Sequence, residues 1–261
     1  MCVDTYIGKG WAKGLTAQTD PRIAKAAAAH RGMAYVKPAG RIPTWSPEIA
    51  YALGLTATDG CMVRDGRHIA FVTKDEDLMQ TWLRCLAHSE QRYRKSLSSA
   101  GTPVYRVQLS DACLYRWFLE RGLTPRKSLT LGALDAPNAL LPHVIRGLLD
   151  GDGSIYVVRH RPTKVLYPDY WYTRLWTFFT SASCDHVSWL RQRIRATWGL
   201  NGFVETTRRP GRNDFYRLKY GKNESLRLLE ALYSDPAAPH LARKREKWLD
   251  YLSEHCAEGG I

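Results

Sequence analysis

The sequence predicts an α/β fold of the α+β kind, with two pseudo-symmetric halves that each follow the order α-β-β-α-β-β-α. A duplicated motif is the first observation behind this prediction. The segments Ala52–Gly60 and Ile145–Gly153 both have Gly at the third position, Leu at the fourth and Asp-Gly at the end. An apolar stretch precedes each segment and a strand-like stretch follows it. Such a duplication indicates two similar halves, each contributing one carboxylate to a shared centre.

The elements of the first half follow from local signals. Ser46 suits a helix N-cap, Pro47 the first helical position and Glu48 the positive helix end, so a helix is expected to run to about Thr58. Asp65-Gly66 suits a tight hairpin turn between two short strands. The later elements, which rest on helical spacing and strand alternation, are a helix opening at 74–77, a hairpin of 92–95 with 104–109, and a helix over 112–121.

The second half repeats this order with longer strands. The expected elements are a helix over 142–151, strands near 154–160 and 170–180, a helix around 185–198, a hairpin over 203–220, and helices over 223–233 and 240–253. We therefore divide the chain into an N-terminal extension (1–45) with a short helix near 21–30, a first half (46–130), a linker (131–141) and a second half (142–261).

Composition favours a polyanionic partner. The chain has 38 basic and 25 acidic residues and a formal net charge of +13, which suits nucleic acid. Its six cysteines show no zinc-binding spacing, and no apolar run is long enough to cross a bilayer. We expect a soluble intracellular protein, with the bacterial cytoplasm and an organelle both open as compartments.

The paired motifs resemble those of the LAGLIDADG homing endonucleases in their monomeric, two-motif form. The segment Gly147–Ser154 is a close match, whereas Thr56 and Ala57 replace the usual apolar residue and acid in the first copy. The resemblance covers about residues 46–250 and implies a DNA-binding antiparallel sheet in each half, the halves being joined at their motif helices. It also implies a monomeric, intron-encoded, site-specific endonuclease that cuts a long asymmetric duplex site and leaves short 3′ overhangs.

The resemblance also assigns the catalytic residues. Asp59 and Asp152 would be catalytic acids and metal ligands, and the backbone carbonyls of Thr58 and Gly151 would complete the metal site. Mg²⁺ suits such oxygen ligands and typically takes one or two carboxylates. Asp150 is a weaker candidate because Ala57 stands at its counterpart in the first motif.

A lysine in each half belongs near the active site of this family. The segments 125–128 and 241–245 look like the relevant ones and place Lys127 and Lys244 in that role. The alternative is that both lysines simply contact phosphates. Lys74 and Ser181, each just after the second strand of its half, match positions that help organise active-site water.

Strand alternation selects candidate DNA contacts, since a β-ribbon fits the major groove. Arg106 and Gln108 should lie opposite a core-facing set on their strand, and the alternation predicts the same for Arg217 and Lys219. Trp171 and Trp176 are candidates for the core. The full candidate set is Arg67, Lys74, Arg94, Arg106, Gln108, Arg159, Tyr172, Arg174, Ser181, Arg208, Arg212, Arg217 and Lys219.

Two other functions fit the same fold. One is an RNA maturase that assists the splicing of its own intron, with intron RNA as partner. The other is a catalytically silent DNA-binding regulator. Silent relatives tend to lose the motif acids, whereas both acids are present here, so endonuclease activity is the leading hypothesis.

Overall fold

The computed structural model describes residues 15–16, 18–30, 42–161, 171–208 and 210–256, and the chain divides into two compact units, Met1–Arg41 and Ile42–Ile261. In the first unit the predicted short helix is present as α1 (Pro21–His30). The rest of the expected extension is mostly outside the described residues, and so is the first residue of the strand predicted at 170–180.

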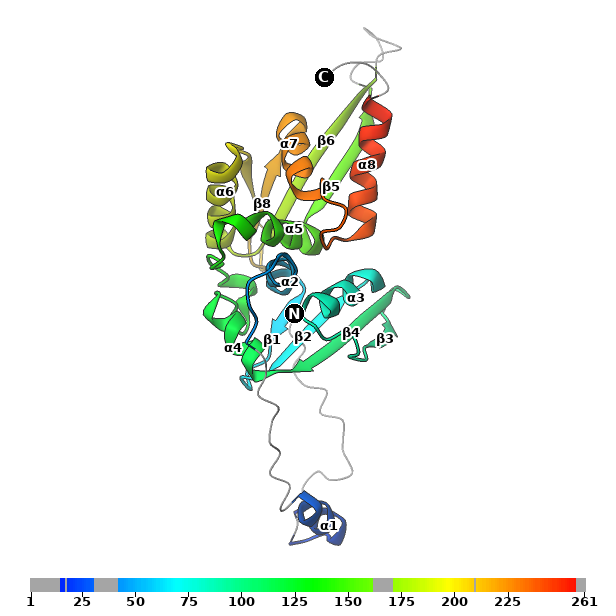
Figure 1. Ribbon diagram of the computed structural model, residues 1–261, viewed down its shortest axis with the longest axis vertical. Coiled ribbons are helices and arrows are strands. Elements are labelled where there is room, and N and C mark those ends of the chain that lie inside the picture. The colour runs from blue at the N-terminus through cyan, green and yellow to red at the C-terminus, as the bar shows by residue number, and fades with distance from the viewer. Residues whose placement is uncertain (1–14, 17, 31–41, 162–170, 209, 257–261) are drawn as a thin grey trace. The chain divides into compact units, whose positions relative to one another are not determined.

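The second unit contains both predicted halves (Figure 1). The elements of the first half are α2 (Pro47–Thr58), β1 (Gly60–Met62), β2 (His68–Thr73), α3 (Glu76–Cys85), β3 (Arg94–Leu97), β4 (Pro103–Ser110) and α4 (Ala112–Glu120). Two short 3₁₀ helices, η1 (Lys127–Leu129) and η2 (Asn138–Leu140), connect the halves. The elements of the second half are α5 (Leu141–Asp152), β5 (Ser154–His160), β6 (Tyr172–Ser181), α6 (Cys184–Trp198), β7 (Phe203–Thr207), β8 (Phe215–Tyr220), α7 (Lys222–Tyr233) and α8 (Ala242–Cys256).

The two sheets have equivalent topologies, which confirms the predicted pseudo-symmetric α+β fold. Each is four-stranded and antiparallel, with strand orders β1-β2-β4-β3 and β5-β6-β8-β7. Each half therefore follows the order α-β-β-α-β-β-α. The second half then adds α8 after this unit.

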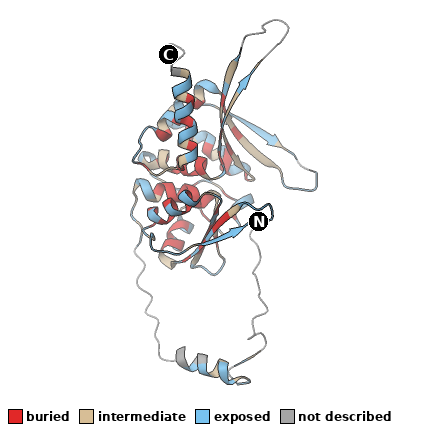
Figure 2. Ribbon diagram, turned by 90° about the vertical axis from the view of Figure 1, so that its right-hand side faces the viewer, coloured by how far each residue is buried: buried red, intermediate tan, exposed pale blue. Residues whose placement is uncertain are grey.

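The motif helices α2 and α5 pack side by side at the centre of the unit (Figure 1). Ser46 caps α2 by accepting a hydrogen bond from the backbone N–H of Ile49 at 3.2 Å, as its position predicted. Gly54 and Gly147 permit the close contact, because a Cβ at Gly54 would lie 3.0 Å from the Gly147 Cα and 2.9 Å from the Leu148 amide nitrogen. Both helices are buried along most of their length (Figure 2).

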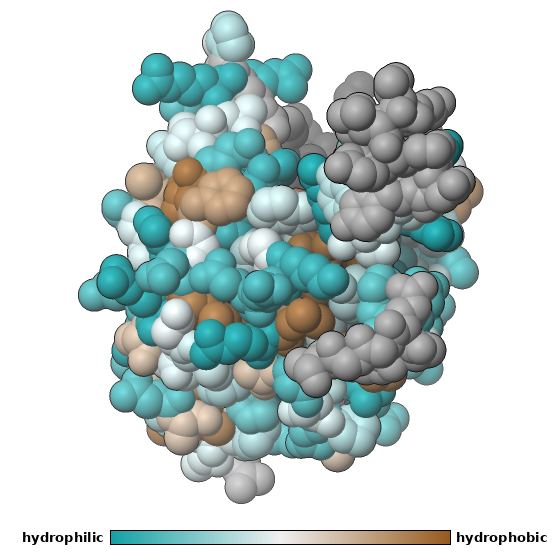
Figure 3. Space-filling model, turned by 90° about the horizontal axis from the view of Figure 1, so that it is seen from above, coloured by the Kyte–Doolittle hydropathy of each residue, from teal (hydrophilic) through white to brown (hydrophobic). Residues whose placement is uncertain are grey.

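Each sheet buries one face and leaves the other open. On β4, Tyr105 and Val107 are buried whereas Arg106 and Gln108 are exposed, as the alternation predicted. On β6 the buried side chains are those of Leu175, Thr177 and Phe179. Seen end-on, the surface is mainly hydrophilic, with apolar side chains in small scattered areas (Figure 3).

Two local expectations differ from the structure. Trp171 is 45% exposed just before β6, so it is not a core residue, and Trp176 is half-buried on the open face of the sheet. The turn at Asp65-Gly66 is wider than a two-residue hairpin, since β1 ends at Met62 and β2 begins at His68. Within this turn the Asp65 carboxylate accepts the backbone N–H groups of Arg67 (3.2 Å) and His68 (3.1 Å). In the part of the chain that the structure describes, no helix has the length and apolar character to span a bilayer.

Candidate active site and nucleic-acid interface

Asp59 and Asp152 lie at the C-terminal ends of the two motif helices. Asp59 is the C-cap of α2, and its N–H bonds to the Leu55 carbonyl, while Asp152 is the last residue of α5. The helices run in the same direction, since Gly54 meets Gly147 and, one turn later, Thr58 meets Gly151. The packing therefore brings the two predicted acids together, with Thr58 and Gly151 directly before them.

The electrostatics of this pair disfavour two free negative charges. Desolvation raises the pKa of Asp59 from 3.8 to about 7, and the charge of Asp152 adds to this rise. Desolvation also raises the pKa of Asp152, although that residue reaches solvent. Lys127 and Lys244 oppose both rises. Burial thus disfavours the charged form of both carboxylates despite the nearby lysines, and a bound cation would favour that charged form.

Lys127 and Lys244 occupy equivalent positions beside Asp59 and Asp152. Lys127 donates a hydrogen bond to the carbonyl of Gly60, the residue after Asp59, and Lys244 donates to the carbonyl of Gly153, the residue after Asp152, at 2.8 Å. Both side chains are buried. Burial disfavours the alternative in which these lysines contact phosphates.

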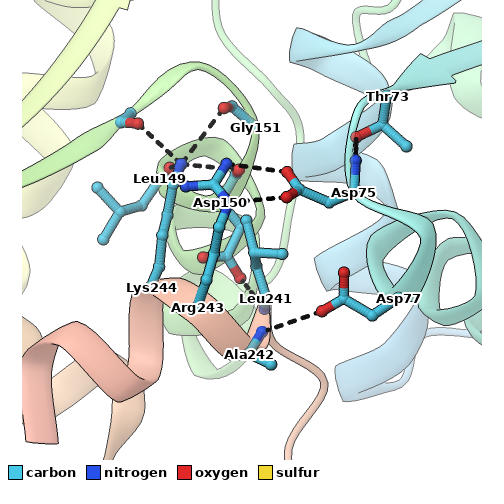
Figure 4. A network of polar contacts seen from close by, with 11 residues as sticks. Thr73, Asp75, Asp77, Leu149, Asp150, Gly151, Leu241, Ala242, Arg243 and Lys244 are labelled. Carbon is cyan, nitrogen blue, oxygen red and sulfur yellow. Dashed lines mark hydrogen bonds and ion pairs between the residues drawn. The ribbon is translucent and has the colours of Figure 1, made fainter. Parts of the chain in front are cut away.

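Lys244 also bonds to the last carbonyls of α5 (Figure 4). Its ammonium group lies 2.5 Å from the Leu149 oxygen, 2.8 Å from that of Asp150 and 3.3 Å from that of Gly151. A cation at this helix end satisfies carbonyls that have no partner within the helix. Desolvation lowers the pKa of Lys244 from 10.5 to about 8.

A polar clasp, formed by Asp75, Asp77, Ala242 and Arg243, joins the two halves beside Lys244 (Figure 4). The Arg243 guanidinium makes two hydrogen bonds of 2.8 Å with the Asp75 carboxylate, and the Ala242 N–H donates to Asp77 at 3.3 Å. The Arg243 guanidinium lowers the pKa of Asp75. Because Arg243 directly precedes Lys244, the clasp fixes the start of α8 and hence the lysine. The sequence pattern predicts no functional role for Asp75, Asp77 or Arg243.

Asp150 holds the helix interface together. It is buried and accepts hydrogen bonds from the hydroxyls of Tyr51 (2.7 Å) and Tyr233 (2.5 Å) and from the Leu241 N–H (2.8 Å). Tyr51 belongs to α2 and Tyr233 to α7. Every one of these contacts is structural, which agrees with the weaker candidacy of Asp150 as a metal ligand.

The candidate DNA contacts separate by sheet. On the open face of the first sheet, Arg94 and Arg106 are cross-strand neighbours next to Gln108, and Arg67 and Lys74 are exposed in the adjoining turns. On the second sheet, Arg174 bonds to the Tyr172 hydroxyl at 2.5 Å. The remaining basic candidates of the second sheet are exposed or half-buried; these are Arg159, Arg208, Arg212, Arg217 and Lys219.

Ser181 lies apart from this surface. It is half-buried and its hydroxyl accepts the Ser183 N–H at 3.1 Å, in the turn that leads to α6. Ser181 lines a small cavity together with Thr58, Asp152 and His186. This placement beside an acid fits the expected contribution to active-site water better than direct contact with a base.

The architecture matches solved structures. The meganuclease I-AabMI, bound to uncleaved DNA, superposes with a TM-score of 0.53 at 16% identity, over 82% of this chain and 91% of that one. The meganuclease I-SmaMI, bound to uncleaveable DNA, gives a TM-score of 0.53 at 12% identity, over 80% and 90%. The chain has the LAGLIDADG fold. The two segments that resemble the LAGLIDADG motif in the sequence lie on α2 and α5 and just after them.

The remaining comparisons show weaker similarity or none. Full-length DUF199/WhiA from Thermatoga maritima matches with a TM-score of 0.49 at 14% identity, and the match covers 85% of this chain and 64% of that protein. No protein-family model matches the sequence, and a search of curated proteins found no relative.

Proposed function

We propose that this LAGLIDADG protein is a site-specific, metal-dependent endonuclease that cuts double-stranded DNA. We further propose that the protein is a monomeric, intron-encoded homing endonuclease that recognises a long asymmetric site and leaves short 3′ overhangs. The observation that carries it is the pair Asp59 and Asp152, placed together by helices that pack through glycine. Two adjacent carboxylates whose charged forms are disfavoured by burial favour a metal-binding site over a catalytically silent DNA-binding protein.

The residues present fit Mg²⁺. Among the described residues, no cluster of three or more His, Cys, Asp or Glu side chains exists, but Mg²⁺ typically uses one or two carboxylates together with waters and substrate phosphates. Asp59 and Asp152 would hold it, with the carbonyls of Thr58 and Gly151 as further oxygen ligands. When bound, the ion neutralises phosphate charge and acidifies water.

The chain's own groups would then position the reaction. Lys127 and Lys244 fix the carbonyls around the two acids and offset part of their charge. The clasp between Arg243 and Asp75 holds the two halves in register around this centre. The basic open faces of the two sheets would bind the duplex on either side, since each strand pair fits a major groove.

A cleavage selection tests the proposal. A library of randomised duplexes is incubated with the protein and Mg²⁺, and the new ends are sequenced. We expect one long asymmetric consensus with short 3′ overhangs and no products in EDTA. A library that remains uncut at every Mg²⁺ and Mn²⁺ concentration would refute endonuclease activity. Splicing of an intron RNA with no cleavage of any duplex would favour the maturase hypothesis.

A further inference from the structure

The open faces of the two sheets differ in chemistry. In the first sheet the cross-strand rows place Arg106 between Arg94 and Val72, and Gln108 beside Ala70. In the second sheet the equivalent face carries four aromatic rings in adjacent rows, which we name the aromatic platform: Tyr156, Trp176, Phe178 and Phe203. The register pairs Tyr156 with Trp176, and it places Lys219 between Phe178 and Phe203.

The rings of the platform form one continuous cluster. The ring centroid of Phe178 lies 6.3 Å from that of Tyr156 and 6.3 Å from that of Trp176. The Trp176 ring meets Phe203 edge-on at 6.0 Å. Tyr156 is 48% exposed and Phe203 46% exposed, so the cluster offers an apolar surface to solvent that the core does not use.

The cations on this face are already engaged. Arg217 and Lys219 both lie over the Phe178 ring at 5.5 Å. Glu205 pairs with Lys219 at 2.7 Å and with Arg217 at 3.6 Å. A hydrogen bond from either cation to a base would have to compete with Glu205. Direct polar readout is therefore weaker here than on the first sheet.

We infer that the second half recognises its half-site through the methyl groups of thymine, using the aromatic platform. This inference rests on the proposed function. In the major groove, thymine alone presents an apolar group, the C5-methyl, and apolar side chains discriminate it by contact. Arg174 lies on the same face of β6 as Trp176, and Arg208 and Arg212 are exposed between β7 and β8; these cations supply charge that complements the phosphates. The first half, by contrast, reads guanine and adenine edges with Arg106 and Gln108.

The platform suits a duplex better than a single strand. Stacking of unpaired bases requires an open ring face. The Phe178 face is covered by Arg217 and Lys219, and Trp176 stacks against Phe178 with an interplanar angle of 14°. The partly exposed rings instead offer the shallow apolar surface that a row of methyl groups contacts.

Replacement of thymine by deoxyuridine removes only the methyl group and tests the inference. The duplex consensus is selected by binding in Ca²⁺, and deoxyuridine is then placed in one half-site at a time. Burial of a methyl-sized group is worth about 0.8 kcal/mol, so we expect about fourfold weaker binding for each methyl lost in one half-site. The same replacement in the other half-site should leave the dissociation constant unchanged.

Variants locate the effect. Phe203→Ala and Tyr156→Ala each truncate an exposed ring and should reduce the discrimination between thymine and deoxyuridine. Arg106→Ala is the matched control on the first sheet: binding should weaken, but the discrimination should persist. Circular dichroism verifies that each variant is folded.

The outcomes separate the two proposals. Enrichment of a specific duplex whose affinity is the same with deoxyuridine in either half-site would overturn the methyl readout and leave the endonuclease proposal standing. Discrimination that survives both ring truncations would also overturn it, as would a single-stranded RNA that binds as tightly as the duplex. A selection that enriches no duplex would overturn the proposed function and this inference with it.

Discussion

Substitution of Gly54 by alanine tests whether close helix packing builds the site. The new Cβ would lie 2.9 Å from the Leu148 amide nitrogen and 3.0 Å from the Gly147 Cα, and it would overlap the Val144 carbonyl. All three are backbone atoms of α5, so no side-chain rotation relieves the contact. Overpacking of a core costs about 1–3 kcal/mol, and we expect the upper end because the two backbones must separate.

Helix propensity opposes this cost and sets the net effect. Alanine is favoured over glycine within a helix by about 1 kcal/mol. Gly54→Ala should therefore lower the free energy of unfolding by about 2 kcal/mol, or the melting temperature by about 4–8 °C. Separation of the helices should also move Asp59 from Asp152 and slow cleavage more than it weakens DNA binding.

Thermal unfolding and single-turnover cleavage measure the two effects. Gly132→Ala is the matched control, because a Cβ there meets no atom within 4 Å, and its melting temperature should stay close to that of the wild type. If Gly54→Ala were as stable as the wild type and cleaved at the wild-type rate, the argument that glycine contact brings the two acids together would be wrong.

Three further predictions concern charged side chains of the site. The folded protein keeps the Asp59 proton up to about pH 7 whereas the ordinary value is 3.8, so wild-type stability falls as pH rises between these values. The full difference between the two pKa values corresponds to roughly 4 kcal/mol, and the partial exposure of Asp59 reduces it. We therefore expect Asp59→Asn to be more stable than the wild type by about 1–3 kcal/mol in EDTA at pH 8, and this gain should disappear near pH 4. Equal denaturation curves for the two proteins at pH 8 would contradict this prediction. Arg243→Ala and Asp75→Asn should each change the free energy of unfolding by less than about 1 kcal/mol but slow cleavage several-fold. The double variant should cleave no more slowly than either single variant. Additive losses of cleavage rate in this double-mutant cycle would show that the two side chains do not act as one unit. Asp150→Ala leaves two hydroxyls and one N–H without their acceptor and should cost about 3 kcal/mol in urea denaturation; a loss under 1 kcal/mol would contradict its structural role.

Local patterns predicted the fold well because they were strong and repeated. The cap at Ser46, the paired glycines and the alternation around Arg106 each encode a local geometry that the structure confirms. The duplication explains why the two sheets have the same strand order, although the order itself was not predicted from the sequence. The width of the turn at Asp65 was not predicted, because it depends on which backbone N–H groups its carboxylate accepts.

The polar contacts of the site could not be predicted from the sequence. Arg243 and Asp75 are 168 residues apart, and Asp150 and Tyr51 are 99 apart. Neither pair leaves a periodic signal, since their contact depends on how the two halves pack. Charge complementarity between Asp75 and the basic segment at 243–245 was the one available indication. The motif acids were found because duplication marks them twice.

Side-by-side measurement of cleavage and DNA binding for Asp59→Asn, Asp152→Asn and Asp150→Asn tests the central claim most directly. Each change removes a negative charge and nearly keeps the shape. If Asp59 and Asp152 hold metal at a shared centre, either substitution should slow cleavage by orders of magnitude, equivalent to several kcal/mol of transition-state stabilisation, with little change in DNA affinity. Asp150→Asn should affect stability more than cleavage. Cleavage by Asp59→Asn at a rate near that of the wild type would contradict the shared two-carboxylate site.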